Sequence, residues 1–402
     1  MLSFFIEILI PVMVIIAILF GLNTMMVNAS WKKVLVIAAI DIAILYIVNE
    51  MMSDAGFFGT GIGDYSARLL VFIAINIILA TSLNLINGIT GQFSIGHAGF
   101  MAVGAYASAY FTVTYGESIE ASFAFLGETA SSSVVLLIAI LIAALVAAIA
   151  GLIVGIPSLR LKGDYLAIVT LGFAEIIRIV ILNIDAVGGA TGYTVPGYAN
   201  FLWVGIFTII TIVIIHNIVK SDVGRALVSI REDELAAEAM GVNTTRYKVT
   251  AFVIGSAFAG VAGVLFAHYN RFLSTNDFQF IRSFEIIIMI VIGGMGSMTG
   301  AILGAIIVTL LPEVLRQLPD IQIGATTFRF ADLRLVIFAL ILILTMILRP
   351  QGILGTREFG LSWLKRPRKA TAGTETTGDS EGVPIAENAE AKRLQSEEDR
   401  DQ

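Results

Sequence analysis

Hydrophobic runs of nearly bilayer length recur from the N-terminus to about Pro350, and this feature constrains the fold more than any other. A helix needs roughly 20 predominantly apolar residues to cross the hydrocarbon core of a membrane. Hydrophobic residues make up 57% of the chain and charged residues only 14%, which excludes an ordinary water-soluble globule. Strand-like alternation is absent, so we expect an all-α polytopic membrane protein. The expected spans lie near 3–22, 34–52, 67–86, 95–113, 133–156, 164–183, 200–219, 249–270, 284–311 and 331–349.

The distribution of basic residues predicts the orientation of these helices. The connections 53–66, 114–132 and 184–199 contain no Lys or Arg, so we place them outside the cell. The intervening connections carry the bases of a cytoplasmic side, namely Lys32, Lys33, Arg160, Lys162, Lys220, Arg225, Arg231, Arg246 and Lys248. A further basic cluster between Arg349 and Lys369 is also expected inside, which requires an even number of crossings after residue 248. The sequence therefore predicts about 10–11 transmembrane helices in the plasma or inner membrane, with the N-terminus outside, the C-terminus cytoplasmic and 284–311 forming two elements.

Two glycine-rich segments interrupt the hydrophobic pattern, NGITGQFSIGHAGF (residues 87–100) and GGMGSMTG (residues 293–300). Paired interruptions of this kind are typical of broken or re-entrant helices at a substrate path, and they indicate a probable internal repeat. An equally good interpretation is that small residues let helices pack closely. The candidate path residues are Gly88, Thr90, Gly91, Gln92, Ser94, His97, Gly293, Gly294, Gly296 and Ser297.

The longest polar connection on the predicted cytoplasmic side is 220–248. Arg231 to Met240 is strong helix-forming sequence, and Gly241 is well placed to end the helix. The apolar positions of this short helix share one face, which the connection itself has no means of burying. A groove on a soluble partner is the natural place for that face.

Five ordered sequence blocks resemble one family. They are residues 87–100, GDYLAIVTLGFAEIIRIVILN (163–183), GRALVSIREDELAAEAMGV (224–242), IGGMGSMTGAILGA (292–305) and RPQGILG (349–355). Together they resemble the LivM-type permease of branched-chain amino acid importers over about 69–355, and five blocks in order are far more specific than one motif.

The resemblance implies four kinds of protein partner and a small-molecule amino acid substrate. The partners are a second, LivH-type permease, two cytoplasmic ATPase subunits and an extracytoplasmic solute-binding protein. It also implies that the 220–248 connection is the loop that couples to the ATPases, through Arg231, Glu232, Asp233, Glu234, Ala237 and Gly241. We divide the chain into two N-terminal helices (1–66), a permease core (67–355) and a cytoplasmic basic stretch with a disordered acidic tail (356–402).

Catalytic and cofactor chemistry is not expected in this chain. It has no G-x-x-x-x-G-K-[ST] phosphate loop and no cysteine, and its three histidines are far apart. We therefore expect a non-catalytic subunit without metal or cofactor, whose partners bind the ATP. A nucleic-acid partner is not expected either. The net charge of −6 comes from the tail after Lys369, and the rest of the chain is neutral overall.

Two other functions remain open. Urea or short amides are alternative substrates, since related permeases share these blocks. A self-contained secondary transporter would place coupling-ion carboxylates at the interruptions, where residues 87–100 and 293–300 have none. Glu175 and Arg178 are interpreted as a structural ion pair on one helix face.

Overall fold

The computed structural model describes residues 40–46, 64–161, 163–316, 321–323, 326–328, 334–349 and 351–355. All of these residues belong to one compact unit, Met1–Gly360, whereas a second unit, Leu361–Gln402, lies outside the described residues. The predicted span 3–22, most of 34–52 and the acidic tail also lie outside them.

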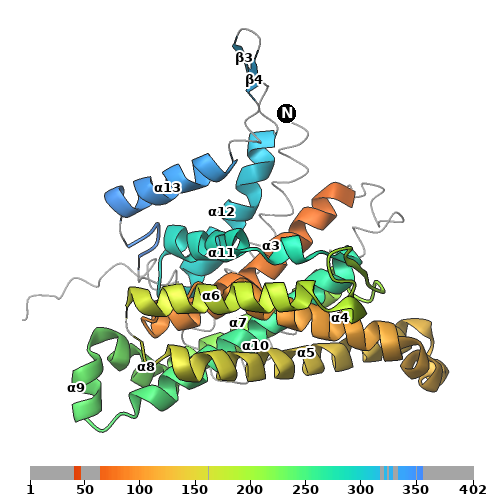
Figure 1. Ribbon diagram of the computed structural model, residues 1–402, viewed down its shortest axis with the longest axis horizontal. Coiled ribbons are helices and arrows are strands. Elements are labelled where there is room, and N and C mark those ends of the chain that lie inside the picture. Colours follow the sequence, from red (N-terminus) through yellow and green to blue (C-terminus); the bar gives the residue numbers. More distant parts are fainter. Residues whose placement is uncertain are drawn as a thin grey trace, which may run out of the picture. The chain divides into compact units, whose positions relative to one another are not determined.

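The described part of the chain is almost entirely helical (Figure 1). Its helices are α3 (Asp64–Asn84), the π-helical turn η1 (Leu85–Ile89), α4 (His97–Ser122), α5 (Glu128–Ser158), α6 (Asp164–Leu182), α7 (Phe201–Lys220), α8 (Asp222–Glu232), α9 (Glu234–Ala239), α10 (Thr244–Asn270), α11 (Phe280–Gly293), α12 (Met298–Arg316) and α13 (Arg334–Leu348). Short 3-10 turns occur at η2 (Ala124–Leu126), η3 (Asp185–Val187) and η4 (Thr275–Phe278). The strands are two antiparallel pairs, β1 (Tyr193–Thr194) with β2 (Phe272–Leu273) and β3 (Ile321–Ile323) with β4 (Thr326–Phe328).

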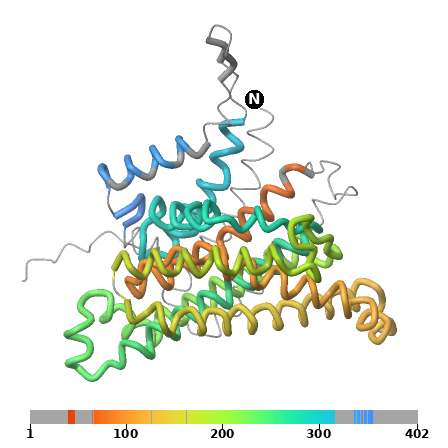
Figure 2. The backbone as a smooth tube through the Cα atoms, in the orientation of Figure 1, coloured from red at the N-terminus to blue at the C-terminus, as the bar shows by residue number. Residues whose placement is uncertain are grey.

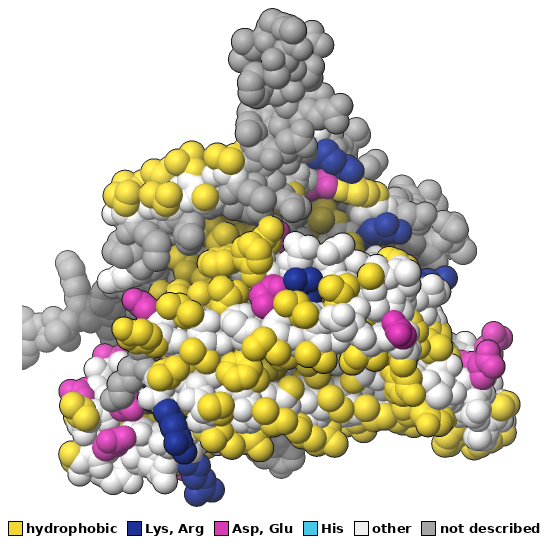
Figure 3. Space-filling view, in the orientation of Figure 1, with side chains coloured by type: hydrophobic (Ala, Val, Ile, Leu, Met, Phe, Trp, Pro, Cys, Tyr) yellow, Lys and Arg dark blue, Asp and Glu magenta, His cyan; other side chains and the backbone are white. Residues whose placement is uncertain are grey.

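Six helical segments of the described part are long and apolar enough to cross a membrane: Ala67–Ile89, α5, α6, α7, α10 and α12. Figure 3 shows hydrophobic side chains spread over the face that α5 and α6 form, with an acidic and a basic side chain together near its middle and other charged side chains toward its ends. An apolar face of this kind suits contact with lipid. The all-α polytopic fold expected from the sequence is thereby confirmed, while the total of 10–11 spans includes residues outside the described range and stays a prediction.

Helix α3 lies at the centre of the unit. Between Leu70 and Leu83 nearly every side chain is fully buried, and α3 contacts α7, α10, α11 and α12. Helices α4, α5 and α10 form a second tightly packed group. There the backbones approach closely, because a Cβ at Gly104 would collide with Gly260 and one at Gly263 would collide with the carbonyl of Met101. Small residues thus set the helix spacing in this group.

The predicted span 284–311 is two helices, as the charge distribution required. Figure 2 traces α11 and α12 as a hairpin that turns at residues 294–297. The two helices extend beyond the predicted limits, from Phe280 to Arg316, with 14 residues in α11 and 19 in α12. The two pack backbone to backbone, since a Cβ at Gly304 would collide with the Met289 carbonyl.

One predicted connection is shorter than expected. Helix α4 runs on to Ser122, so Glu117 and Glu120 belong to a helix and not to the connection 114–132. The helix can continue because residues 114–122 contain no proline. The one glycine among them, Gly116, packs within the helix against the Tyr198 hydroxyl.

Candidate functional site

The first glycine-rich segment is a genuine break between two helices. After α3 the chain makes the π-helical turn η1, continues without regular structure over residues 90–96, and enters α4 at His97. The freed backbone groups are satisfied locally, because Asn87 Nδ2 donates to the Ser94 carbonyl (3.0 Å) and Asn87 Oδ1 accepts from the Ser94 amide (3.2 Å). Thr90 Oγ1 donates to the Leu85 carbonyl at 2.8 Å. We refer to residues 85–96 as the first break.

The second break, residues 294–297, contacts the first one directly. A Cβ at Gly88 would collide with the Gly296 amide nitrogen, so the two segments meet backbone to backbone. Asn84 holds them in register: its Oδ1 accepts from the Gly296 amide (2.8 Å) and its Nδ2 donates to the Ser297 carbonyl (3.2 Å). Asn84 was not among the residues singled out from the sequence. The sequence did carry a signal for it, because Asn84 is a polar residue at the end of an otherwise apolar helix. In the structure Asn84 is buried.

The chain near the C-terminal end of the described residues closes the second break. The amides of Ile353 and Leu354 donate to the carbonyls of Ile292 (2.9 Å) and Gly293 (3.1 Å), which are the last carbonyls of α11. Gly294 packs against Gly352. The groups freed by the break are therefore paired within the protein, as the membrane environment demands.

The connection 220–248, which the sequence predicts on the cytoplasmic side, forms two helices where the sequence indicated one. Residues 221–243, which we call the coupling segment, contain α8 and α9, and the continuous helix expected from Arg231 to Met240 is wrong. Asp233 leaves the helical conformation (φ −158°, ψ 110°) and caps α9, its Oδ1 accepting from the amides of Leu235 (2.9 Å) and Ala236 (3.1 Å). Aspartate favours this capping position over a helix interior. Gly241, at φ +86°, directly follows the end of α9, as expected of a glycine that ends a helix.

Arg231 joins the coupling segment to both breaks. Its Nη1 donates to the Gly88 carbonyl at 3.1 Å, and its aliphatic part packs against Gly91. The same guanidinium lies beside Gly296. Its other nitrogens bind Glu232 Oε1, at 2.7 Å from Nη2. Predicted coupling residues and predicted path residues therefore meet at one side chain.

A cavity of about 250 Å³ separates the coupling segment from the first break. It is lined by Thr90, Gly91, Gln92, Phe93, Leu161, Gly163, Leu166, Ile230, Arg231, Glu232, Asp233, Glu234 and Lys248. Glu234 and Lys248 form an ion pair across it at 2.7 Å, with Lys248 on α10 largely buried. Gln92 is 5% exposed, and both atoms of its amide lack a hydrogen-bond partner in the part of the chain that the structure describes.

The outer face of α9 is apolar and open. Leu235 is 70% exposed and Met240 84% exposed, whereas Ala237 is buried against the unit. Two large exposed hydrophobic side chains on so short a helix are a surface that a partner can cover. This agrees with the face predicted from the sequence.

The other candidate residues lie deeper. His97 is 1% exposed and its Nε2 lies 2.9 Å from Ser82 Oγ, while Ser94 is paired with Asn87 as described above. Gly293 packs against the Gly300 carbonyl, and Ser297 Oγ accepts from the Gly300 amide at 3.1 Å to cap α12. Their role in a substrate path stays a prediction.

Three polar residues of the helices, Glu175, Arg178 and Asn76, have partners in the structure. Arg178 Nε donates to Glu175 Oε2 at 2.8 Å, so the expected ion pair is present. Asn76 Nδ2 donates to Thr309 Oγ1 (2.8 Å), and its Oδ1 accepts from Arg282 Nη2 (2.6 Å). The Glu175 and Arg178 interpretation is thus supported by geometry, while the partners of Asn76 come from helices that the sequence did not connect to it.

Comparison with known proteins gives a consistent result. Residues 65–346 match the family model described as the permease component of branched-chain amino acid transport systems. The chain is 33% identical to the high-affinity branched-chain amino acid transport system permease protein LivM of Salmonella typhimurium, covering 72% of this chain and 70% of the relative. It is 34% identical to LivM of Escherichia coli, over 70% of this chain and 68% of the relative.

A shorter match, 30% identical over 34% of this chain, is to the permease protein LivH of Escherichia coli, of which it covers 41%. No solved structure gives a significant match. The family match spans the helices that carry both breaks and the coupling segment, and on this evidence the chain belongs to the family of permease components of branched-chain amino acid transport systems.

Proposed function

We propose that this chain is one of two membrane subunits of an ATP-driven importer of branched-chain amino acids, and that α8 and α9 receive the force from separate ATPase subunits. A second, LivH-type permease, two cytoplasmic ATPases and an extracytoplasmic solute-binding protein complete the assembly. The relatives named LivM and LivH support a pair of related permeases. ATP is bound by the partner chains, and this chain is non-catalytic.

The observation that carries the proposal is the linkage from an open apolar helix to the two broken membrane segments. Helix α9 presents Leu235 and Met240 outward, while Arg231 contacts Gly88 at the first break and lies beside Gly296 at the second. A movement of the coupling segment cannot occur without displacing this contact. Rigid displacement of packed helices is a common route from a docking site to a conformational change.

We assign the two sides of the membrane from the connections that gather at each end of the helices. Five parts of the chain gather at one end, through the cavity beside Arg231 and the contacts of Gly294. They are the first break, the pair Leu161 and Gly163, the coupling segment, the second break and residues 351–355. Arg160, the coupling segment and Arg349 bring basic residues to this end, so we assign it to the cytoplasm. The opposite end contains the β1–β2 pair and the hydrogen bond between His268 Nδ1 and the Pro196 carbonyl (2.8 Å), which tie residues 193–196 to the end of α10.

Co-purification of the tagged chain from its native membrane, followed by leucine uptake in proteoliposomes, tests the proposal. We expect two ATPases and a second permease to be recovered, and uptake to require ATP. Leu235→Ser and Met240→Ser together should release the ATPases, since each side chain contributes on the order of 1 kcal/mol when its exposed part is buried. Arg225→Gln, an exposed substitution on α8, is the matched control. Uptake by the chain alone, or full retention of the ATPases by the double variant, would contradict the proposal.

A further inference from the structure

Helix α6 presents a regular stripe of residues to the outside of the unit. Of the six candidate membrane spans in the described part of the chain, α6 has the smallest share of buried residues. None of the residues in the stripe is buried, and their spacing alternates between three and four positions. We call it the α6 stripe, and it consists of Tyr165, Ile168, Gly172, Glu175, Ile179 and Leu182. An average spacing of about 3.5 residues is the one at which two helices pack along their length as a left-handed pair.

A charged pair interrupts this apolar surface near the middle of the membrane. Glu175 belongs to the α6 stripe and Arg178 flanks it, and the two are the only charged residues of α6 after Asp164. At a rise of about 1.5 Å per residue, Glu175 lies roughly 16 Å from the start of α6, about half of a hydrocarbon core of ~30 Å. Figure 3 shows the acidic and the basic side chain together near the middle of the face that α5 and α6 form. Charges at this depth face protein or water, and not lipid.

The guanidinium of Arg178 is only partly satisfied by its own chain. Its Nε donates to Glu175 Oε2 at 2.8 Å, and Glu175 Oε1 accepts from the Phe280 amide at 3.0 Å. Within the residues that the structure describes, neither Nη1 nor Nη2 of Arg178 has a hydrogen-bond acceptor. The side chain is 19% exposed, so these nitrogens are open to a neighbour. Lipid tails contain no acceptor, and the missing groups are therefore expected from another protein segment.

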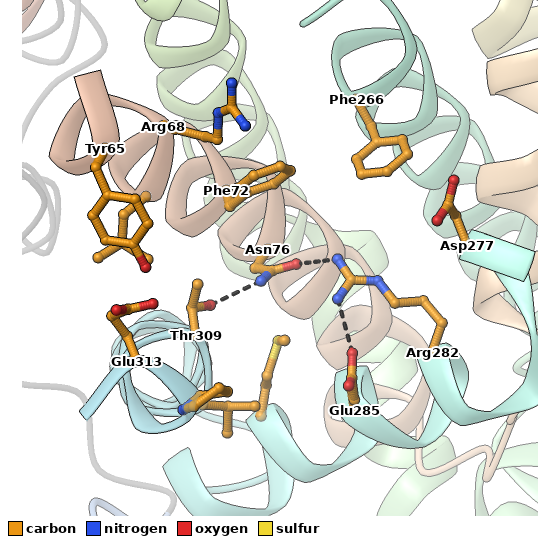
Figure 4. A pocket seen from close by; sticks show the side chains of 14 residues that line it. Tyr65, Arg68, Phe72, Asn76, Phe266, Asp277, Arg282, Glu285, Thr309 and Glu313 are labelled. Atoms are coloured by element: carbon orange, nitrogen blue, oxygen red, sulfur yellow. Dashed lines mark hydrogen bonds and ion pairs between the residues drawn. The ribbon is translucent and has the colours of Figure 1, made fainter. Parts of the chain in front are cut away.

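Arg282 on the neighbouring helix α11 shows how a guanidinium is satisfied elsewhere in this protein (Figure 4). Its Nη1 donates to Glu285 Oε2 (2.9 Å) and its Nη2 to Asn76 Oδ1 on α3 (2.6 Å). Asn76 Nδ2 in turn donates to Thr309 Oγ1 on α12 (2.8 Å). These four side chains line a cavity of about 350 Å³ and pair with one another. A helix packed across the α6 stripe would complete the hydrogen bonds of Arg178 in the same way.

The surface on both sides of the α6 stripe suits a packed helix. Ile176 and Arg178 flank the stripe on opposite sides, as the helical repeat requires. Beside Ile176 lies an apolar groove of about 420 Å³ between α4 and α6, near the Leu182 end of α6, which can take apolar side chains from a neighbour. On α11 the exposed rings of Phe280 and Phe284 add aromatic surface. The stripe, its charged pair and the groove therefore form one continuous contact surface.

We propose that the α6 stripe is the surface on which a membrane helix of the second permease subunit packs, with a hydrogen-bond acceptor of that helix opposite the Nη groups of Arg178. The assignment rests on the proposed import function, which includes two permeases. A second copy of this chain fits the surface poorly, because a two-fold pair would bring two Glu175 carboxylates of like charge together near its axis. A lipid also fits poorly, since its polar headgroup lies outside the hydrocarbon core.

Photo-cross-linking from single positions tests this interface in the assembled importer. The complex is purified with p-benzoyl-phenylalanine in place of Ile168 or Ile179, irradiated in proteoliposomes, and its adducts are identified by mass spectrometry. We expect both positions to form adducts with the second permease. The matched control is Ile214 on α7, an apolar residue that is also exposed but lies outside the stripe, and it should form no such adduct.

The charged pair gives a second readout, which separates an interface from an ion pair that serves only this chain. The double variant Glu175→Leu with Arg178→Leu leaves neither charge without its partner on α6, so the tagged chain should stay folded. It should nevertheless retain about three- to tenfold less of the second permease after a detergent wash, because the partner loses its charged donor. Arg178→Lys, which keeps a charged donor, should retain more than Arg178→Leu. Full retention by the double variant would overturn the interface.

Failure of the interface and failure of the import function give different results. Suppose that the wild-type chain recovers the second permease, but that the stripe forms adducts only with lipid or with this chain itself, or that Ile214 forms the same adduct. The interface is then overturned and the import function stands. If no second permease is recovered with the wild-type chain, the proposed import assembly itself fails.

Discussion

Replacing Arg231 by glutamine should separate ATP hydrolysis from transport. The substitution removes the hydrogen bond from Nη1 to the Gly88 carbonyl and the guanidinium beside Gly296. A hydrogen bond from a charged donor contributes about 1.5–3 kcal/mol. The lower value applies here, because the Arg231 side chain is 28% exposed and water can replace part of the contact.

The ion pair of Arg231 with Glu232 adds little to this figure. The Glu232 side chain is 69% exposed, and exposed ion pairs contribute about 0–1 kcal/mol. A loss of about 1.5 kcal/mol corresponds to roughly a tenfold change in an equilibrium. If the contact exists in only one of the two conformations that alternate during transport, the population of that conformation falls by about the same factor.

The measurement compares leucine transported with ATP hydrolysed in proteoliposomes that contain the whole importer. We expect Arg231→Gln to retain its ATPases and most of their activity, while the amount transported per ATP falls about tenfold. Arg225→Gln on the same helix is the control. Within the described part of the chain Arg225 pairs only with the exposed Asp222 and the Lys220 carbonyl, so this variant should remain within twofold of wild type. An unchanged ratio for Arg231→Gln, or an equal loss for Arg225→Gln, would refute this reasoning.

Two further predictions concern stability, measured as thermal unfolding of the purified complex in detergent. Gly104→Ala should destabilise the protein by about 1–3 kcal/mol, because the new Cβ would collide with the Gly260 backbone. Gly172→Ala in α6 is the control: its Cβ meets open space, so the substitution should be neutral or stabilising by up to about 1 kcal/mol. Equal effects at the two sites would contradict the packing described here. Glu175→Leu and Arg178→Leu should each cost on the order of 2 kcal/mol, since each leaves a partly buried partner uncompensated, and combining the two should recover most of the loss. Strictly additive losses in the double variant would show that the pair contributes nothing as a pair.

Much of the site could be located from the sequence, because glycine and charge leave strong local signals. The two glycine-rich segments are breaks as predicted, and Gly241 follows the end of α9 with the positive φ that glycine favours. The pairing of Glu175 with Arg178 followed from their spacing of three on one helix face. The break at Asp233 was missed, because the helix propensity of the residues around it outweighed the capping preference of aspartate in the reading of the sequence.

The sequence by itself determined that the chain spans a membrane, that its helices are interrupted at two glycine-rich points, and which connections share a side. Those properties depend on hydrophobicity, glycine and charge, which act locally along the chain. Only the tertiary structure decided that the two breaks touch, that Asn84 holds them together and that Arg231 reaches Gly88 from the coupling segment. These contacts join residues more than 140 positions apart. They depend on the close packing of helices and on the need to pair every buried polar group. Neither requirement produces a recognisable pattern along the sequence.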